Sequence, residues 1–147
     1  MAEGSRSVSD VFADTGYWVA ILDSRDRLHE RARTITAALG TRRLVTTHMV
    51  LAEVLNLMRS PHDEGRERAW QLAQRLEDDP IVEIVPQTGA QFRAAVERYA
   101  ARPDQRWSLT DCASFLLMEE RGIGEALAYA RDFEQAGFAA PLRDGPA

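Results

Sequence analysis

The stretch Val11-Phe-Ala-Asp-Thr-Gly-Tyr-Trp-Val-Ala-Ile-Leu22 joins two apolar segments at a single carboxylate, Asp14. The first segment, Val8–Ala13, is expected to form a short strand, whose last three residues, Val11-Phe-Ala13, are apolar as in a buried strand. The second, Thr15–Leu22, is also largely apolar and indicates a short helix. An acid that follows a strand lies at its carboxyl end, where parallel α/β sheets bind their ligands. The stretch therefore predicts an α/β fold and makes Asp14 the first candidate site residue.

The rest of the chain alternates strands and helices in the same way. Three further strands are expected at Leu44–Thr46, Ile81–Val85 and Ala126–Tyr129, and Phe138–Leu142 is a candidate edge strand. Helices are expected from Asp26 to Gly40, over Met49–Met58 and Glu64–Glu77, from Thr88 through Tyr99, and from Ser108 to Gly122. Apolar residues recur there at helical spacing, and Thr, Ser and Gly stand where helix caps belong. Strands separated by helices predict a mainly parallel sheet of four to five strands with helices on both faces.

Length and composition fit one cytoplasmic domain. The 147 residues suffice for one core, and we assign residues 8–142 to a single domain with tails at 1–7 and 143–147. No apolar run approaches the roughly 18 residues that cross a bilayer, and no charged-then-apolar signal segment opens the sequence. Cys112 is the only cysteine, which excludes an intrachain disulfide. We therefore expect a cytoplasmic protein without a membrane partner. The net charge of −5 argues against broad coating of nucleic acid, although a local basic groove remains compatible with it.

Glu53 is a second candidate because it stands among apolar residues in the helix expected over Met49–Met58. We expect that helix to be largely buried, and a buried carboxylate is costly unless it is paired or binds a cation. The alternative is a solvent-facing stripe in which Glu53, Asn56 and Arg59 recur at three-residue spacing. The spacing alone is compatible with both interpretations.

Asp111 is the third candidate and lies in the string Ser108-Leu-Thr-Asp-Cys-Ala-Ser114. Its distance of three residues from Ser108 is that of a capping-box variant, in which the carboxylate satisfies backbone donors at the helix start. Asp14 could likewise be no more than the N-cap of the helix that begins at Thr15. The functional alternative is that Asp14, Glu53 and Asp111 converge on a divalent cation.

Four strings, in this order along the chain, resemble the motifs of PIN-domain proteins, and in particular the toxin ribonucleases of the VapC type. They are Asp14-Thr-Gly-Tyr-Trp-Val-Ala-Ile-Leu-Asp23, Thr47-His-Met-Val-Leu-Ala-Glu53, Ser108-Leu-Thr-Asp-Cys-Ala-Ser114 and Arg131-Asp-Phe-Glu-Gln-Ala-Gly-Phe138. The resemblance covers roughly residues 8–142. Each string alone is weakly specific, whereas four in order form a specific pattern.

The resemblance implies a three-layer α/β/α sandwich and a metal-dependent endoribonuclease. Carried over by motif, Asp14, Glu53 and Asp111 are catalytic acids, with Asp14 and Asp111 as ligands of Mg²⁺ or Mn²⁺, which prefer oxygen donors. The hydroxyls of Thr15 and Thr110 are candidates for supporting these ligands. The resemblance also implies an RNA substrate, a cognate antitoxin protein as partner, and a homodimer.

One segment departs from the family pattern. Family members usually end the fourth strand with an aspartate, but aligning Tyr129-Ala-Arg-Asp-Phe133 on Phe133 puts Ala130 at that position. Asp132 stands two residues later. Either Asp132 replaces the missing acid through a backbone shift, or the site has three acids, or the chain is a catalytically degenerate PIN fold that binds RNA or a partner. Asp132 is therefore the fourth candidate catalytic acid.

Other classes of site fit the sequence less well. The chain contains no lysine, which phospho-receiver domains need, and Asp14-Thr-Gly lacks the second acid of aspartyl phosphatases. The three histidines are scattered without the spacing of zinc ligands: His29, His48 and His62. The arginine-rich stretch Arg25–Arg43 reads most simply as a solvated helix face, with a share in RNA phosphate binding as the alternative.

Overall fold

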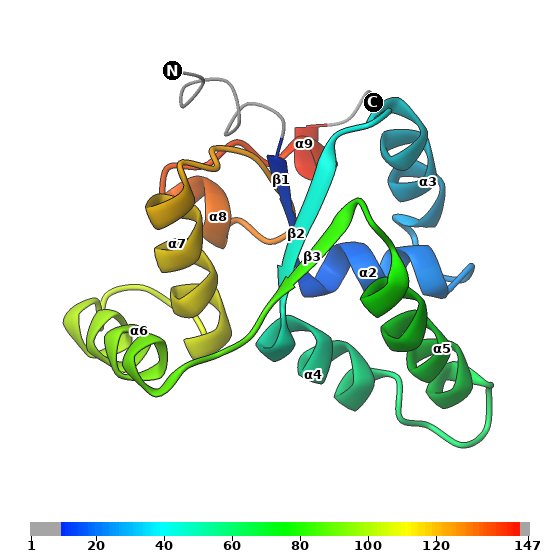
Figure 1. Cartoon of the computed structure of the whole chain (residues 1–147), viewed down its shortest axis with the longest axis horizontal. Helices are drawn as coiled ribbons and strands as arrows, with labels where there is room; N and C mark the ends of the chain where they lie inside the picture. Colours follow the sequence, from blue (N-terminus) through cyan, green and yellow to red (C-terminus); the bar gives the residue numbers. More distant parts are fainter. Residues whose placement is uncertain (1–9, 145–147) are drawn as a thin grey trace.

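Four parallel strands form the centre of the molecule in the computed structural model, which describes residues 10–144 (Figure 1). They are β1 (Asp10–Ala13), β2 (Arg43–Thr47), β3 (Val82–Val85) and β4 (Ala126–Leu127), in the spatial order β3-β2-β1-β4. In this register Phe12 of β1 pairs with Val45 on one side and Ala126 on the other. All four strands therefore end at the same edge of the sheet, which confirms the predicted α/β class.

Helices cover the sheet on both sides (Figure 1). On one side lie α2 (Thr15–Leu22), α3 (His29–Ala38), α4 (His48–Leu57) and α5 (Gly65–Asp78). On the other side lie α6 (Gly89–Ala101), α7 (Leu109–Arg121) and the short α8 (Asp132–Gln135), while α9 (Pro141–Asp144) packs near β4. Within residues 10–144, no helix has the length and apolarity needed to cross a membrane.

Three helices begin at the capping residues that were predicted from the sequence. Thr47 Oγ1 accepts the backbone N–H of Val50 at the start of α4, and Thr88 opens α6 in a capping box. Ser108 opens α7 in a second capping box, and α7 ends at Gly122, whose φ of 68° suits a residue without a Cβ. One start differs from expectation: Asp26 caps a turn by accepting the Leu28 N–H, and α3 follows it.

The candidate edge strand over Phe138–Leu142 is wrong. The segment makes one isolated parallel bridge, between Glu125 and Ala139, and α9 begins at Pro141. Gly137 turns the chain with a φ of 100°, and proline lacks the N–H that continued pairing requires. The fourth strand is also shorter than predicted, and the chain leaves the sheet after Leu127. Residues 8 and 9 of the first predicted strand lie outside the described residues.

The expectation that the helix over Met49–Met58 is largely buried is also wrong. Its inner face is covered, but Leu55 and Leu57 are 38% and 66% exposed. In α2, by contrast, the large residues Tyr17 and Trp18 are nearly fully covered. Apolar composition alone did not separate residues that face the core from residues that remain on the surface of α4.

An aromatic cluster connects the sheet to the second helical layer. The ring of Phe133 lies 4.9 Å from that of Phe115 in α7 and 6.1 Å from that of Phe12 in β1. All three side chains are fully buried, and burying a phenylalanine contributes about 1.5–3 kcal/mol. The cluster holds the start of α8 between β1 and α7, and this arrangement fixes the position of the neighbouring residue, Asp132.

Candidate active site

Asp14 lies at the carboxyl end of β1 and is held there by backbone hydrogen bonds. Its N–H donates to the carbonyl of Leu127, and its own carbonyl accepts the N–H of Tyr17. Asp14 is the N-cap residue of α2, but its carboxylate makes no side-chain capping hydrogen bond, and the backbone N–H of Thr15 only partly offsets the burial of its charge. The residue is only 9% exposed. Burial, reinforced by the charge of Asp111, raises the pKa of Asp14 to about 7.

Thr46 positions the backbone next to Asp14, a role that the sequence analysis missed. Its Oγ1 donates to the carbonyl of Ala13 at 2.9 Å and accepts the indole N–H of Trp18 at 3.4 Å. Thr46 is fully buried. Its first partner, Ala13, directly precedes Asp14, and its second partner, Trp18, lies on α2, the helix that follows Asp14. A threonine at the end of a strand that pairs with β1 was the signal available in the sequence.

Glu53 reaches the same edge of the sheet from α4. Its Oε1 accepts the hydroxyl hydrogen of Thr15 at 2.6 Å, which ties the carboxylate to the residue after Asp14. Glu53 is half-buried, whereas Asn56 and Arg59 are exposed. The proposed solvent stripe therefore begins beyond Glu53, and Glu53 itself faces the acid cluster.

Asp111 caps α7 and also lies among the other candidate acids. Its Oδ2 accepts the N–H of Ser108 at 3.0 Å, and the hydroxyl of Ser108 accepts the N–H of Asp111 at the same distance, which completes the capping box. Burial, reinforced by the adjacent Asp132 carboxylate, nevertheless raises the pKa of Asp111 to about 6. One carboxylate can thus cap α7 and also face the other acids.

Asp132 lies beside Asp111, and their carboxyl groups are within hydrogen-bonding reach of each other. Its neighbour Phe133 is anchored in the aromatic cluster, so the first residue of α8 stands beside the start of α7. Ala130 is exposed on the connecting segment. Of the two residues, Asp132 thus has its carboxylate beside Asp111, and whether it replaces the acid missing at Ala130 stays a prediction.

The four predicted acids converge in space. The charges of Asp111, Glu53 and Asp132 all act to raise the pKa of Asp14. Within residues 10–144, however, no three acidic, histidine or cysteine side chains are already arranged to hold one ion. The cluster thus offers carboxylates that act on one another electrostatically without being arranged around a single ion.

Two hydroxyl groups border this cluster on α7. Thr110 is buried next to Asp111, as its predicted supporting role requires. One turn further along, the hydroxyl of Ser114 is fully buried without a hydrogen-bond partner among the described residues. A buried polar atom without a partner is uncommon, and an ordered water is the usual way in which it is satisfied.

Three comparisons with known proteins show which family the chain resembles. The 23S rRNA-specific endonuclease VapC20 of Mycobacterium tuberculosis, in strains H37Rv and CDC 1551, is 28% identical over 130 residues, covering 87% of this chain and 95% of that protein. The crystal structure of M. tuberculosis VapC20, described as a sarcin-ricin loop cleaving toxin, superposes with a TM-score of 0.79 at 26% identity, covering 88% of this chain and 96% of that one. Residues 11–139 match the PIN domain. Because that match spans most of the sequence, the chain belongs to the PIN-domain family.

Proposed function

We propose that the chain is a metal-dependent endoribonuclease and the toxin component of a VapC-type toxin–antitoxin pair. The observation that carries the proposal is the convergence of Asp14, Glu53, Asp111 and Asp132 at the carboxyl edge of a PIN-type sheet. The similarity to VapC20, which is named as a 23S rRNA-specific endonuclease, supports RNA as the substrate class. Cleavage of cellular RNA would place the protein in the cytoplasm.

The donor set fits Mg²⁺ or Mn²⁺. All four candidate groups are carboxylates, the hard oxygen donors that these cations prefer, and Mg²⁺ commonly binds through one or two carboxylates while keeping several waters. Burial first, and the neighbouring carboxylates second, raise the pKa of Asp14 and of Asp111, so a bound cation would offset the cost of their charged forms. We infer that Asp14 and Asp111 are the direct ligands. When bound, the cation would lower the pKa of a coordinated water and offset charge on the phosphodiester.

The protein's own residues supply orientation. The hydrogen bond from Thr15 fixes one oxygen of Glu53 and leaves the other to accept a proton from the attacking water. Asp111 is held by its capping hydrogen bonds, and Phe133 holds Asp132 against it. Each acid is thus positioned by a contact made before the substrate arrives, which reduces the reorganisation required during the reaction.

A divalent-cation titration tests this function. We expect the purified chain to cut RNA only with Mg²⁺ or Mn²⁺ and to lose the activity in chelator. In parallel, a cation that binds only the folded state should add about 2.7 kcal/mol of stability at a hundredfold excess over its dissociation constant, or roughly 5–10 °C in melting temperature. The double variant Asp14→Asn/Asp111→Asn should show neither effect. Equal melting shifts in both proteins, or cleavage that persists in chelator, would contradict the proposed site.

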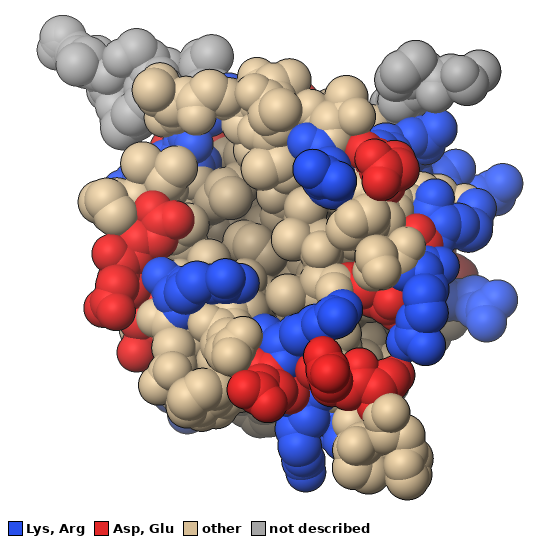
Figure 2. Space-filling view, turned by 90° about the vertical axis from the view of Figure 1, so that its right-hand side faces the viewer, with Lys and Arg blue, Asp and Glu red and all other residues tan. Residues whose placement is uncertain are grey.

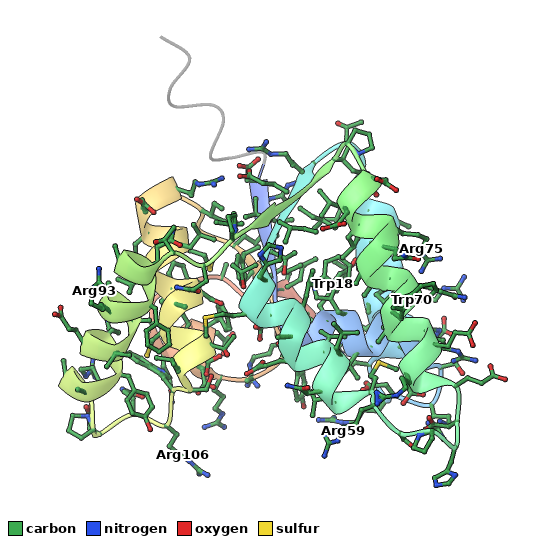
Figure 3. The ribbon with its side chains drawn as sticks, turned by 60° about the horizontal axis from the view of Figure 1, so that its bottom comes forward. Trp18, Arg59, Trp70, Arg75, Arg93 and Arg106 are labelled. Atoms are coloured by element: carbon green, nitrogen blue, oxygen red, sulfur yellow. The ribbon has the colours of Figure 1, made fainter. Side chains whose placement is uncertain are left out.

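The surfaces left exposed suit the two protein partners that we propose. On α6, Phe92, Val96 and Tyr99 recur along one face and are 46%, 41% and 55% exposed. Between α4 and α5, Leu55 and Trp70 border a cavity of about 900 Å³ (Trp70 is labelled in Figure 3). We assign the α6 face to a homodimer, because a helix face can pack on its own copy, and the α4–α5 cavity to an antitoxin segment.

Light scattering tests the homodimer. At concentrations on the order of tens of micromolar we expect twice the chain mass of 16.5 kDa. Val96→Arg should give a monomer, because it places a charge in the centre of the apolar contact, whereas Arg93→Glu on the same helix, whose side chain points away from the body of the molecule in Figure 3, should remain a dimer. A monomeric native protein at these concentrations would refute the assignment.

A further inference from the structure

A small basic cavity lies outside the acid cluster. It has a volume of about 340 Å³ and is lined by Arg27, Leu28, Arg31, Tyr129 and Arg143. These residues come from three separate parts of the chain. Arg27 and Leu28 precede α3 and Arg31 lies in it, Tyr129 follows β4, and Arg143 lies in α9. Figure 2 looks at the side of the molecule that carries α3 and α5 and shows basic side chains gathered on it, most densely along the right-hand margin.

The arginines are held in place around one aromatic ring. The guanidinium carbon of Arg27 lies 4.6 Å from the centre of the Tyr129 ring, and that of Arg143 lies 5.6 Å from it. Arg27 also donates to the Tyr129 hydroxyl, and Arg143 donates to the Tyr129 carbonyl. Arg31 donates to the carbonyl of Leu142 at 2.9 Å. Side chains fixed in this way lose little conformational freedom when a ligand binds.

Positive charge dominates the cavity. Of its three arginines, Arg143 pairs with Glu134 at 2.9 Å, while Arg27 makes no ion pair within residues 10–144. Arg27 is also exposed, so its remaining N–H groups are open to solvent. A planar guanidinium matches the oxygens of a phosphate group, and clustered arginines are a common phosphate-binding arrangement.

The cavity is close to the acid cluster along the chain. Asp132 comes three positions after Tyr129, so their Cα atoms lie at most about 11 Å apart. Tyr129 also follows β4, which pairs with β1 directly before Asp14. A nucleic-acid strand that rises about 3.4 Å per nucleotide would cross this distance in a few nucleotides.

We propose that the cavity binds a backbone phosphate of the RNA strand a few nucleotides from the bond that is cut. The proposal rests on the nuclease function above and names a contact for its substrate. RNA is a polyanion, whereas the chain has a net charge of −5 and an acidic active site, so the attraction must come from local basic groups. Phosphate contacts of this kind set the position of a strand without reading its sequence.

A structural role for the same arginines is the competing explanation. Arg31 and Arg143 contact the backbone of α9 and of the segment after β4, so both fasten the C-terminal helix whether or not RNA binds. Arg27 separates the two explanations, because its recorded contacts are with Tyr129 and not with α9. The test therefore uses Arg27.

The experiment measures binding of a labelled single-stranded RNA in chelator, where no cleavage occurs, from about 50 to 200 mM salt. Arg27→Gln should bind roughly three- to tenfold more weakly, and the slope of log K against log salt should become shallower by about 0.7, the value for one phosphate contact to a single strand. Arg27→Lys should keep the native salt slope, because it retains the charge, while losing part of the affinity with the planar fork. Melting temperatures should match that of the native chain.

Arg33→Gln is the matched control. It removes the same charge from an exposed position of α3, where the one ion pair of Arg33 among residues 10–144 is with Glu30, at 4.0 Å and outside the cavity. Equal losses in Arg27→Gln and Arg33→Gln, or no loss in either, would overturn the phosphate site while leaving the nuclease function intact. A chain that binds RNA through Arg27 but never cuts it would instead reject the nuclease function and retain the phosphate site.

Discussion

Replacing Asp14 by asparagine should lower RNA cleavage by at least a hundredfold and yet make the metal-free protein harder to unfold at pH 8. The loss of activity follows from removing a proposed metal ligand, and a hundredfold corresponds to about 2.7 kcal/mol of barrier. The gain in stability follows from the burial of Asp14 beside three other acids, which raises its pKa from 3.8 to about 7.

The sign of the stability effect follows from proton linkage. Because the folded pKa of Asp14 exceeds the unfolded value, the folded state binds more protons between about pH 4 and pH 7. The native chain therefore loses stability as the pH rises through this window, and above pH 7 the full cost of the buried charge remains. At about 1.4 kcal/mol per pKa unit, a few kcal/mol is the ceiling of the effect. Asparagine at this position carries no charge and avoids the cost.

Urea unfolding in chelator at pH 4 and pH 8 measures this effect. The difference in unfolding free energy between Asp14→Asn and the native chain should be small at pH 4 and should favour the variant at pH 8. Asp104→Asn is the control, because Asp104 is exposed and its pairing with Arg102 lowers its pKa, which gives the opposite sign. A variant that is less stable than the native chain at pH 8 would show that Asp14 is not electrostatically strained.

The sequence predicted the strands that lie in the core, because their apolar runs are short and bounded by turns. It failed at Phe138–Leu142, where Gly137 and Pro141 turn and end an otherwise apolar segment after one bridge. It also failed to predict the exposed face of α4. A helix that buries apolar residues against a partner protein has the same composition as a helix that buries them in its own core.

The sequence allowed some of the candidate acids to be assigned to the site more readily than others. Asp14 and Asp111 stand at junctions between elements, where spacing was compatible with a helix cap as well as with a cation ligand and only the family resemblance favoured the ligand. Asp132 could not be assigned from spacing, because its position depends on how Phe133 packs against Phe12 and Phe115. The basic cavity was beyond sequence reasoning for a similar reason, since Arg27 and Tyr129 lie 102 residues apart and meet only in the folded chain.

Asp132→Asn should lower RNA cleavage by at least tenfold, or about 1.4 kcal/mol of barrier, whereas Ala130→Asp should change it little. The reason is geometric: Asp132 already lies within hydrogen-bonding reach of Asp111, while Ala130 is exposed on the preceding segment. The pKa of Asp111 should also fall in Asp132→Asn, because the neighbouring charge that raises it is gone, and carboxyl ¹³C NMR can follow that titration. Asp104→Asn again serves as the control for the loss of a surface carboxylate.

If Ala130→Asp instead activates the enzyme and Asp132→Asn has no effect on cleavage, the usual family position is the functional one and the native chain is a weakened nuclease. If neither substitution changes cleavage or metal affinity, the site consists of Asp14, Glu53 and Asp111 alone, and the carboxylate of Asp132 is a neighbour of that site without a part in its chemistry.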